Sequence, residues 1–289
     1  MGRLTTSRRV TAVRIRDGRV TSARSPDVVA VEEPLDIRVN GEQLSVTMRT
    51  PGHDVELVHG LLHAEGIIRD REDVHEARYC DGAVVEDESG LPRNTYNVMD
   101  LSTRDRLLIP IPTHALPMNS ACGVCGSTSI DAVQSSGRYT LTHDWSIAPA
   151  TILAAADELR ARQRIFERTG GVHAAALVHH DGEMLVTRED VGRHNAVDKV
   201  IGWALMEGRL PAADCFLVVS SRASFEIAQK AYLAGIGLLA CVSAPSSLAI
   251  ETAERVGMTL IGFTRSRGDG EGRMNVYTGR DRLDLDPAG

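Results

Sequence analysis

The chain has 289 residues and a formal net charge of −7, and its composition, 43% hydrophobic and 25% charged, is that of an ordinary globular protein. The acidic balance argues against nucleic-acid binding, and no apolar run is long enough to cross a membrane. The first residues lack the apolar core of a signal peptide and the five cysteines are an odd number, so we expect a reduced, cytoplasmic chain.

The first 24 residues form a basic N-terminal segment with seven arginines and a single acidic residue. We expect this segment to be frayed and solvated. An arm that reaches an anionic ligand or a partner is the alternative.

The next part of the chain is predicted to be rich in β-structure. Asn40-Gly41 is a strong hairpin turn between two short strand-like runs. Apolar residues at helical spacing predict a helix from Asp54, as its N-cap, to Ala64, with Gly66 as its stop. Strands are predicted at residues 27–31, 35–40, 43–49, 74–79 and 95–101.

Residues 109–127 are predicted to form an exposed loop, because the prolines in this stretch block regular strand pairing. The loop contains Cys122 and Cys125, the only close cysteine pair of the chain. A helix is predicted over residues 127–134, and amide groups at a helix start lower the pKa of a nearby thiol below its usual value of about 8.5. The thiolate attacks sulfur, binds metal or carries a persulfide, so the pair is the predicted chemical centre.

The second part of the chain alternates helix and strand after a linker near residues 135–148. A long helix is predicted over residues 149–167, with proline in its first turn. Short connections between the later elements predict an α/β domain with helices against a largely parallel sheet, in which Cys215 and Cys241 are small core residues. Strands are predicted at residues 173–180, 183–187, 215–220, 238–243 and 259–263, and helices at residues 195–206, 225–233 and 248–256.

Three predicted strands end in segments rich in hydroxyls and arginines. Ligands usually bind at the carboxyl ends of strands in open α/β sheets, and hydroxyls, helix N-terminal amides and arginines suit phosphate or another anion. Helix capping with surface charge is the alternative for each segment. Arg193 and His194, in a polar stretch that opens a helix, are further candidates. The candidates after the strands are Ser220, Arg222, Ser224, Ser243, Ser246 and the stretch that begins at Phe263.

Zinc enzymes and dithiol oxidoreductases fit the sequence poorly. Zinc nucleoside deaminases place a glutamate two residues after the ligand histidine, but Ala175 takes that place after His173, and the cysteine pair precedes the histidine. A structural zinc site needs four ligands, and there is no second close cysteine pair. The βαβ context of a thioredoxin-like enzyme is not evident around Cys122. We therefore expect no structural metal.

Several segments, in the same order along the chain, closely resemble the FdhD family of formate dehydrogenase accessory sulfurtransferases. The resemblance extends from Glu32 to Leu283, which is nearly the whole chain. The segments are residues 122–126 (CGVCG), 170–175 (GGVHAA), 189–199 (EDVGRHNAVDK), 220–226 (SSRASFE), 243–245 (SAP) and 275–278 (NVYT).

The resemblance implies a sulfur carrier. A cysteine desulfurase passes sulfur to the family's Cys-x-x-Cys loop, which then sulfurates molybdenum bis(molybdopterin guanine dinucleotide), Mo-bis-MGD, before this cofactor enters formate dehydrogenase. The resemblance also implies a homodimer and a cytidine-deaminase-like three-layer domain that binds the guanine nucleotide (GDP-like) portions of the cofactor. The implied division is a basic segment at residues 1–24, a β-rich subdomain at 25–135 and the cofactor-binding domain at 149–289.

By the same resemblance, Cys122 matches the family's persulfide-bearing cysteine and Cys125 its partner. Helix proximity alone favours Cys125 as the more acidic thiol, so both assignments stay open. The stretch from Ser266 to Gly272, before Arg273, is longer and richer in glycine than in the common form of the family. This departure leaves the phosphate contact open among Arg265, Arg267 and Arg273. The cofactor-binding stretch falls on Phe263, Thr264, Arg265, Ser266, Arg267 and Gly268.

Two rival hypotheses come from other classes of protein. The first is a non-catalytic chaperone that binds the molybdenum cofactor and whose cysteines are structural. The second is a zinc-dependent hydrolase.

Overall fold

The computed structural model describes residues 3–80, 84–86, 92–94, 97–104, 137–141, 144–268 and 271–285. The predicted cysteine loop at residues 109–127 and the predicted helix at 127–134 lie outside the described residues. Within the predicted linker, the indole of Trp145 donates a hydrogen bond to the carbonyl of Ala213, and Ile147 forms a β-bridge with Leu283. The described linker residues therefore pack on the C-terminal part.

A six-stranded mixed sheet in the C-terminal part has the order β10-β9-β11-β12-β13-β14. Only the pairs β11–β12 and β12–β13 are parallel. The prediction of a largely parallel sheet is therefore wrong, because β9–β10 and β13–β14 are hairpins whose short connections require antiparallel pairing, and β11 runs antiparallel to β9. The strands are β9 (His173–His179), β10 (Met184–Asp190), β11 (Cys215–Val219), β12 (Leu238–Cys241), β13 (Thr259–Gly268) and β14 (Glu271–Thr278).

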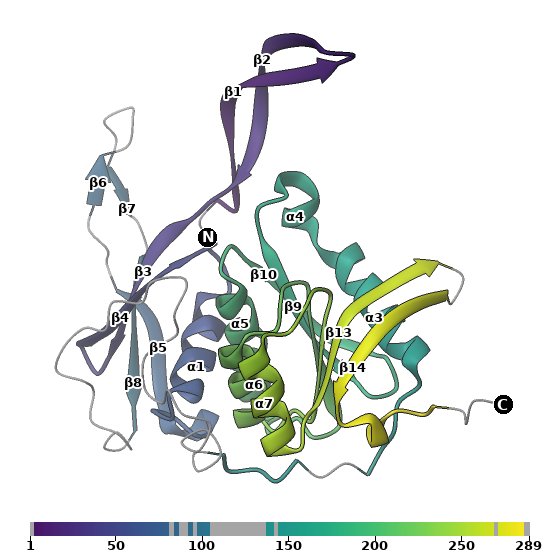
Figure 1. The fold of residues 1–289 in the computed structure, drawn as a ribbon. Coiled ribbons are helices and arrows are strands. Elements are labelled where there is room, and N and C mark those ends of the chain that lie inside the picture. The colour runs from purple at the N-terminus through teal and green to yellow at the C-terminus, as the bar shows by residue number, and fades with distance from the viewer. Residues whose placement is uncertain are drawn as a thin grey trace.

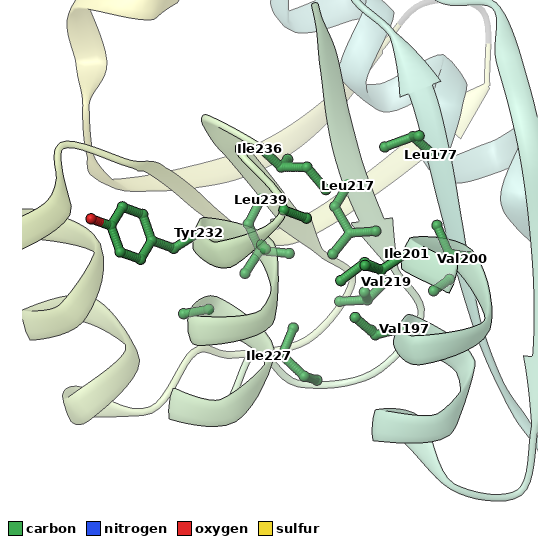
Figure 2. Close-up of a cluster of buried hydrophobic side chains, with 14 of the residues drawn as sticks. Leu177, Val197, Val200, Ile201, Leu217, Val219, Ile227, Tyr232, Ile236 and Leu239 are labelled. Atoms are coloured by element: carbon green, nitrogen blue, oxygen red, sulfur yellow. The ribbon is translucent and has the colours of Figure 1, made fainter. Parts of the chain in front are cut away.

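Helices cover both faces of this sheet, which gives three layers and confirms the mixed α/β class (Figure 1). Because side chains alternate along a strand, Leu217 and Val219 pack toward α5, α6 and α7, whereas Phe216 and Val218 pack toward α3. Figure 2 shows the first of these two cores. Cys215 and Cys241 are buried in it, as predicted. The helices are α3 (Pro149–Arg162), α5 (Arg193–Met206), α6 (Phe225–Leu233) and α7 (Ser247–Val256).

The predicted helix over residues 149–167 is interrupted at Gln163. The chain forms α3 and then a separate short helix, α4 (Arg164–Thr169). The carboxylate of Glu189 on β10 accepts hydrogen bonds from the backbone N–H groups of Ile165 and Phe166, each at 2.9 Å. This side chain stabilises a new helix start that local sequence does not reveal.

Among the helices that the structure describes, no helix has the length and apolar character needed to span a membrane.

A four-stranded sheet in the N-terminal part, with the order β4-β3-β8-β5, packs on helix α1 (Asp54–Ala64). Their shared core includes Leu35 and Leu57. The predicted bounds of α1 are confirmed, but the predicted N-cap is wrong. His53 precedes the helix in the left-handed region, and the carboxylate of Asp54 instead accepts a hydrogen bond from Arg49. The strands are β3 (Glu33–Val39), β4 (Glu42–Arg49), β5 (Val74–Cys80) and β8 (Val98–Thr103), with β6 (Val84–Glu86) and β7 (Pro92–Asn94) as a separate ribbon.

The N-terminal residues form a long hairpin, so the prediction of a frayed segment over residues 1–24 is wrong. Strand β1 (Thr5–Arg16) pairs antiparallel with β2 (Arg19–Ala30) along the full length of both. Asp17 and Gly18 form the turn, both at positive φ, which matches the twist of the flanking strands. The strand predicted at residues 27–31 is the end of β2.

Helices α1 and α5 cross in close contact because each has a glycine at the crossing. A Cβ atom on Gly60 would overlap the backbone carbonyl of Asp198, and one on Gly202 would overlap that of Glu56. The side chain of Glu56 also forms an ion pair with Arg188 of β10. The two glycines therefore let α1, with the small sheet behind it, lie directly on the α5 layer of the large sheet.

We predict that Gly60→Ala and Gly202→Ala each destabilise the protein by about 1–3 kcal/mol, the usual range for overpacking. The contacted atoms belong to backbone carbonyls, which cannot rotate away. Gly171→Ala is the control, because a Cβ atom there would lie 3.7 Å from its nearest neighbour, the Cβ atom of Ala30, which is ordinary van der Waals contact. Thermal denaturation measures the difference. Equal midpoints for all three variants would contradict the close crossing.

Candidate ligand site at the sheet edge

The polar segments that follow β11 and β12 lie side by side with Phe263 of β13 at the carboxyl ends of these strands. The strand predicted to end at residue 263 continues to Gly268, because it pairs with β14, so the rest of the third predicted segment belongs to β13. Ser220, directly after β11, accepts a hydrogen bond on Oγ from the backbone N–H of Ala174 at 2.8 Å. The backbone N–H of Phe263 donates to the carbonyl of Ser243 at 3.0 Å. Ala223 and Pro245 form a parallel β-bridge between the segments that follow β11 and β12. The strand ends therefore form one continuous polar rim.

Three helices begin at this rim, and their caps differ. Ser246 caps α7, accepting the backbone N–H of Ala249 on its hydroxyl at 3.3 Å, so capping accounts for this candidate. Ser224 precedes α6 but makes no side-chain cap. Gly192 precedes α5, which begins at Arg193. Helix N-termini attract anions, so three of them at one edge favour an anionic ligand.

His194 connects two of these helices. Its Nε2 lies 3.2 Å from Oγ of Ser224 and 3.7 Å from a carboxylate oxygen of Glu226. The hydrogen bond from His194 lowers the pKa of Glu226 to about 2, against the effect of burial. Nearby, burial lowers the pKa of His173, and the charges of Arg193 and His194 act in the same direction. The rim thus contains one histidine beside a carboxylate and a second whose pKa is lowered by burial.

The Arg193 guanidinium has an unsatisfied donor. Its Nε is buried and has no hydrogen-bond partner among the described residues. Buried donors are nearly always paired in folded proteins, and an unpaired one costs about 1–3 kcal/mol. An anion at this position would supply the acceptor.

A buried ion pair holds the start of α5 in place. Lys199 Nζ lies 2.6 Å from a carboxylate oxygen of Asp190, and both side chains are excluded from solvent. Burial raises the pKa of Asp190, while the charge of Lys199 and hydrogen bonds from Gly192 and Asn195 oppose that rise. The backbone N–H of Thr50, from the small sheet's side of the molecule, donates to the same carboxylate at 3.2 Å. A hydrogen bond from the N-terminal part of the chain therefore helps to fix the position of Asp190, just before α5.

The stretch that begins at Phe263 leaves the rim along the β13–β14 hairpin. Phe263 has a positive φ of 54°, and the buried hydroxyl of Thr264 donates to the carbonyl of Cys241 at 3.1 Å. Arg265 lies directly opposite Arg273 in the strand register. Like charges in this position repel each other unless an anion lies between them. Exposed side chains here and after β11 are those of Arg222, Arg265, Arg267 and Arg273, while Ser266 pairs with Gly272 and Gly268 with Glu271.

Several parts of the predicted site are not tested by this geometry. Cys122 and Cys125 lie outside the described residues. Within the described ranges, no three His, Cys, Asp or Glu side chains are placed to hold a metal ion. The sequence patterns place Glu226, Asp190 and Lys199 inside motifs but predict no role for them. Glu226 meets His194 from another helix, which local sequence does not reveal. Asp190 and Lys199 lie within one motif, and their opposite charges were the available signal for that pair.

Comparisons with known proteins agree on one family. A model of the FdhD/NarQ family matches residues 30–284. A protein named sulfur carrier protein FdhD from Corynebacterium efficiens is 50% identical, over 96% of this chain and 99% of its own. The protein of that name from Streptomyces coelicolor is 48% identical, over 99% and 98%. The crystal structure of a protein described as a formate dehydrogenase accessory protein, from Desulfotalea psychrophila, has the same fold, with a TM-score of 0.70 at 24% identity over 96% of this chain and 99% of that one.

We predict that Glu226→Gln lowers stability by less than about 1 kcal/mol at pH 7, as for other partly exposed pairs. Because the folded-state pKa of Glu226 is about 2, below the ordinary 4.5, its carboxylate stabilises the fold above pH 4.5 and loses that effect as the pH falls toward 2. The stability difference between parent and variant should therefore shrink by roughly half between pH 5 and pH 3.

Urea denaturation at both pH values measures this difference. Glu254→Gln, on the exposed side of α7, is the matched control and should show no such change. A difference between parent and Glu226→Gln that stays constant with pH would show that the contact between His194 and Glu226 carries no charge effect.

Proposed function

The chain belongs to the FdhD/NarQ family, and from this membership we propose that it is a sulfur carrier for the maturation of formate dehydrogenase. The observation that carries the proposal is the family match over residues 30–284, which includes both the cysteine pair and the sheet-edge motifs. Near-full-length relatives at about half identity carry the name of sulfur carrier protein.

In this proposal Cys122 is the sulfur acceptor. A cysteine desulfurase transfers a sulfane sulfur to its thiolate and a persulfide forms. The outer sulfur of a persulfide is more acidic than a thiol, so it is anionic and nucleophilic at neutral pH. The thiolate of Cys125 attacks the inner sulfur of this persulfide, so a Cys122–Cys125 disulfide forms and the outer sulfur leaves with the bonding electron pair as sulfide. The acceptor of this sulfide is the molybdenum centre of Mo-bis-MGD, the substrate, and a cellular thiol then reduces the disulfide.

The sheet edge is the proposed binding site for the guanine nucleotide portions of that substrate. Three helix N-termini favour its phosphates. A bound anion would supply an acceptor to the Nε of Arg193, which has no hydrogen-bond partner among the described residues. It would also offset the repulsion between Arg265 and Arg273, which lie opposite each other in the strand register. His194, held by Ser224 and Glu226, adds a donor at the same rim.

Other features implied by the resemblance stay predictions. These are the cytidine-deaminase-like classification of the α/β domain, the division at residues 24, 135 and 149, the homodimer and the location in the cytoplasm. The desulfurase and formate dehydrogenase are proposed partners on the same basis.

A cofactor chaperone is the second candidate. It is favoured by one observation, which is that the described sheet edge offers anion-binding groups that do not involve the cysteine pair. In this alternative the chain binds the same substrate but never carries sulfur.

We predict that incubation with a cysteine desulfurase and cysteine adds the mass of one sulfur atom to the peptide with Cys122. Cys122→Ala should lose the adduct, whereas Cys80→Ala, a partly exposed cysteine on β5, is the matched control and should keep it. Intact-peptide mass spectrometry without reductant is the measurement. Retention in Cys122→Ala but loss in Cys125→Ala would move the acceptor to Cys125. Absence of any adduct from the parent chain would leave the chaperone.

A further inference from the structure

The β1–β2 hairpin, residues 5–30, is an arm that pairs only with itself among the described strands. It extends away from the two packed sheets (Figure 1). Twelve residues per strand give it a length of about 40 Å, with the turn at its far end. Isolated two-stranded hairpins are marginal in water, so the exposed end of the arm gains stability from a surface that it binds.

The strand register places three apolar side chains on one face at the end of the arm. Val13, Ile15 and Val20 are 59%, 70% and 64% exposed. Ile15 pairs with Val20, and Val13 lies two residues before Ile15, so the three side chains share this face. Ser22 pairs with Val13 and lies on the same face. This face therefore carries no charged side chain near the turn.

The opposite face of the same end is cationic. Arg16 pairs with Arg19 across the turn, and Arg14 lies two residues before Arg16. All three side chains are exposed, and no ion pair or side-chain hydrogen bond among the described residues engages their guanidinium groups. Asp17, in the turn, is the only acidic residue of the first 24. Like charges that face each other across a hairpin repel, so this face favours an anionic partner.

One partner has to satisfy both faces of the arm. A protein surface that contacts one face of a two-stranded ribbon leaves the other face in water, and a nucleic acid offers phosphates to the arginines but nothing to the apolar side chains. The boundary between the headgroups and the acyl chains of an anionic lipid layer offers both. Apolar side chains enter the acyl region there, while arginines extend their long stems to the headgroup phosphates.

The arm also separates its own charge from that of the body. Seven arginines against one aspartate give residues 1–24 a charge of +6, so the remaining residues carry −13. An anionic surface attracts the arm and repels the body. Interactions between exposed charges decay over about 8 Å at physiological ionic strength. An arm of about 40 Å therefore lets its end reach such a surface while the body stays out of range.

We infer that the end of the β1–β2 arm binds an anionic lipid surface, with Val13, Ile15 and Val20 among the acyl chains and the arginines of the opposite face against headgroup phosphates. This is the attachment of an exposed hairpin to the surface and not a membrane span. The family model begins at residue 30, so the contact lies outside the family-wide part of the chain and is independent of the sulfur-carrier proposal.

Co-sedimentation of the full chain with lipid vesicles tests the attachment. We expect binding to vesicles with equal parts of phosphatidylcholine and phosphatidylglycerol and no detectable binding to pure phosphatidylcholine. Arg14→Gln with Arg16→Gln should lower the partition coefficient about thirtyfold, since each arginine near an anionic surface contributes about fivefold. Arg104→Gln with Arg280→Gln removes the same charge at exposed positions away from the arm and should leave the coefficient unchanged.

Two outcomes of this experiment would overturn the inference. The first is an equal effect of the two pairs of substitutions, or binding to neither kind of vesicle. The second is retention of the parent chain on immobilised polyglutamate without binding to the mixed vesicles, which would assign the arm to an acidic protein instead.

Tryptophan variants of the full chain test which face enters the lipid. Ile15→Trp places an indole on the apolar face, and Thr21→Trp, at the partner of Arg14, places one on the arginine face. Mixed vesicles whose phosphatidylcholine is brominated in the acyl chains quench the indoles that reach those chains. We expect Ile15→Trp to be quenched beyond the parent chain, whose Trp145 and Trp203 give the baseline, and Thr21→Trp to match the parent. Equal quenching of both variants, or of neither, would overturn the inference.

Discussion

The contact between helices α1 and α5 is the constraint on which the rest of the structure depends. Gly60 and Gly202 each face a backbone carbonyl of the opposite helix, so the helices approach to a distance that no side chain permits. This contact joins the small N-terminal sheet to the large C-terminal sheet. It also fixes α5, whose first residues are Arg193 and His194.

The contact between the N-terminal and C-terminal parts of the chain continues into the site as a polar network. Asp190 and Lys199 form a solvent-excluded ion pair, and Thr50 adds hydrogen bonds from the N-terminal part to Asp190 and to the Val191 backbone. A buried ion pair adds little net stability, but it is costly to break, so it holds its surroundings in one arrangement. The helix N-termini at the sheet edge are therefore oriented by both parts of the chain. The start of α5 is thereby held in one position, together with the Arg193 Nε that has no hydrogen-bond partner among the described residues.

Local sequence patterns predicted much of this fold. Apolar spacing gave the bounds of α1, and alternation of helix and strand gave α5 to α7 and the strands between them, because these elements bury their own periodic faces. Local sequence patterns did not predict contacts between residues that are distant in the sequence. The break at Gln163 depends on Glu189, and the pairing of His194 with Glu226 spans two helices. No strand was predicted for the residues of β14, which pair antiparallel with β13. The Asp17-Gly18 turn was a visible hairpin signal, but the density of arginines around it suggested a solvated segment instead.

The central claim is that sulfur travels to the molybdenum cofactor on this chain's own cysteines. Formate dehydrogenase activity in cells that depend on this chain for its maturation tests that claim most directly. With serine at positions 122 and 125, in a chain that is expressed and folded at the normal level, the account predicts that no active formate dehydrogenase forms. Full activity with both serines in place would contradict it.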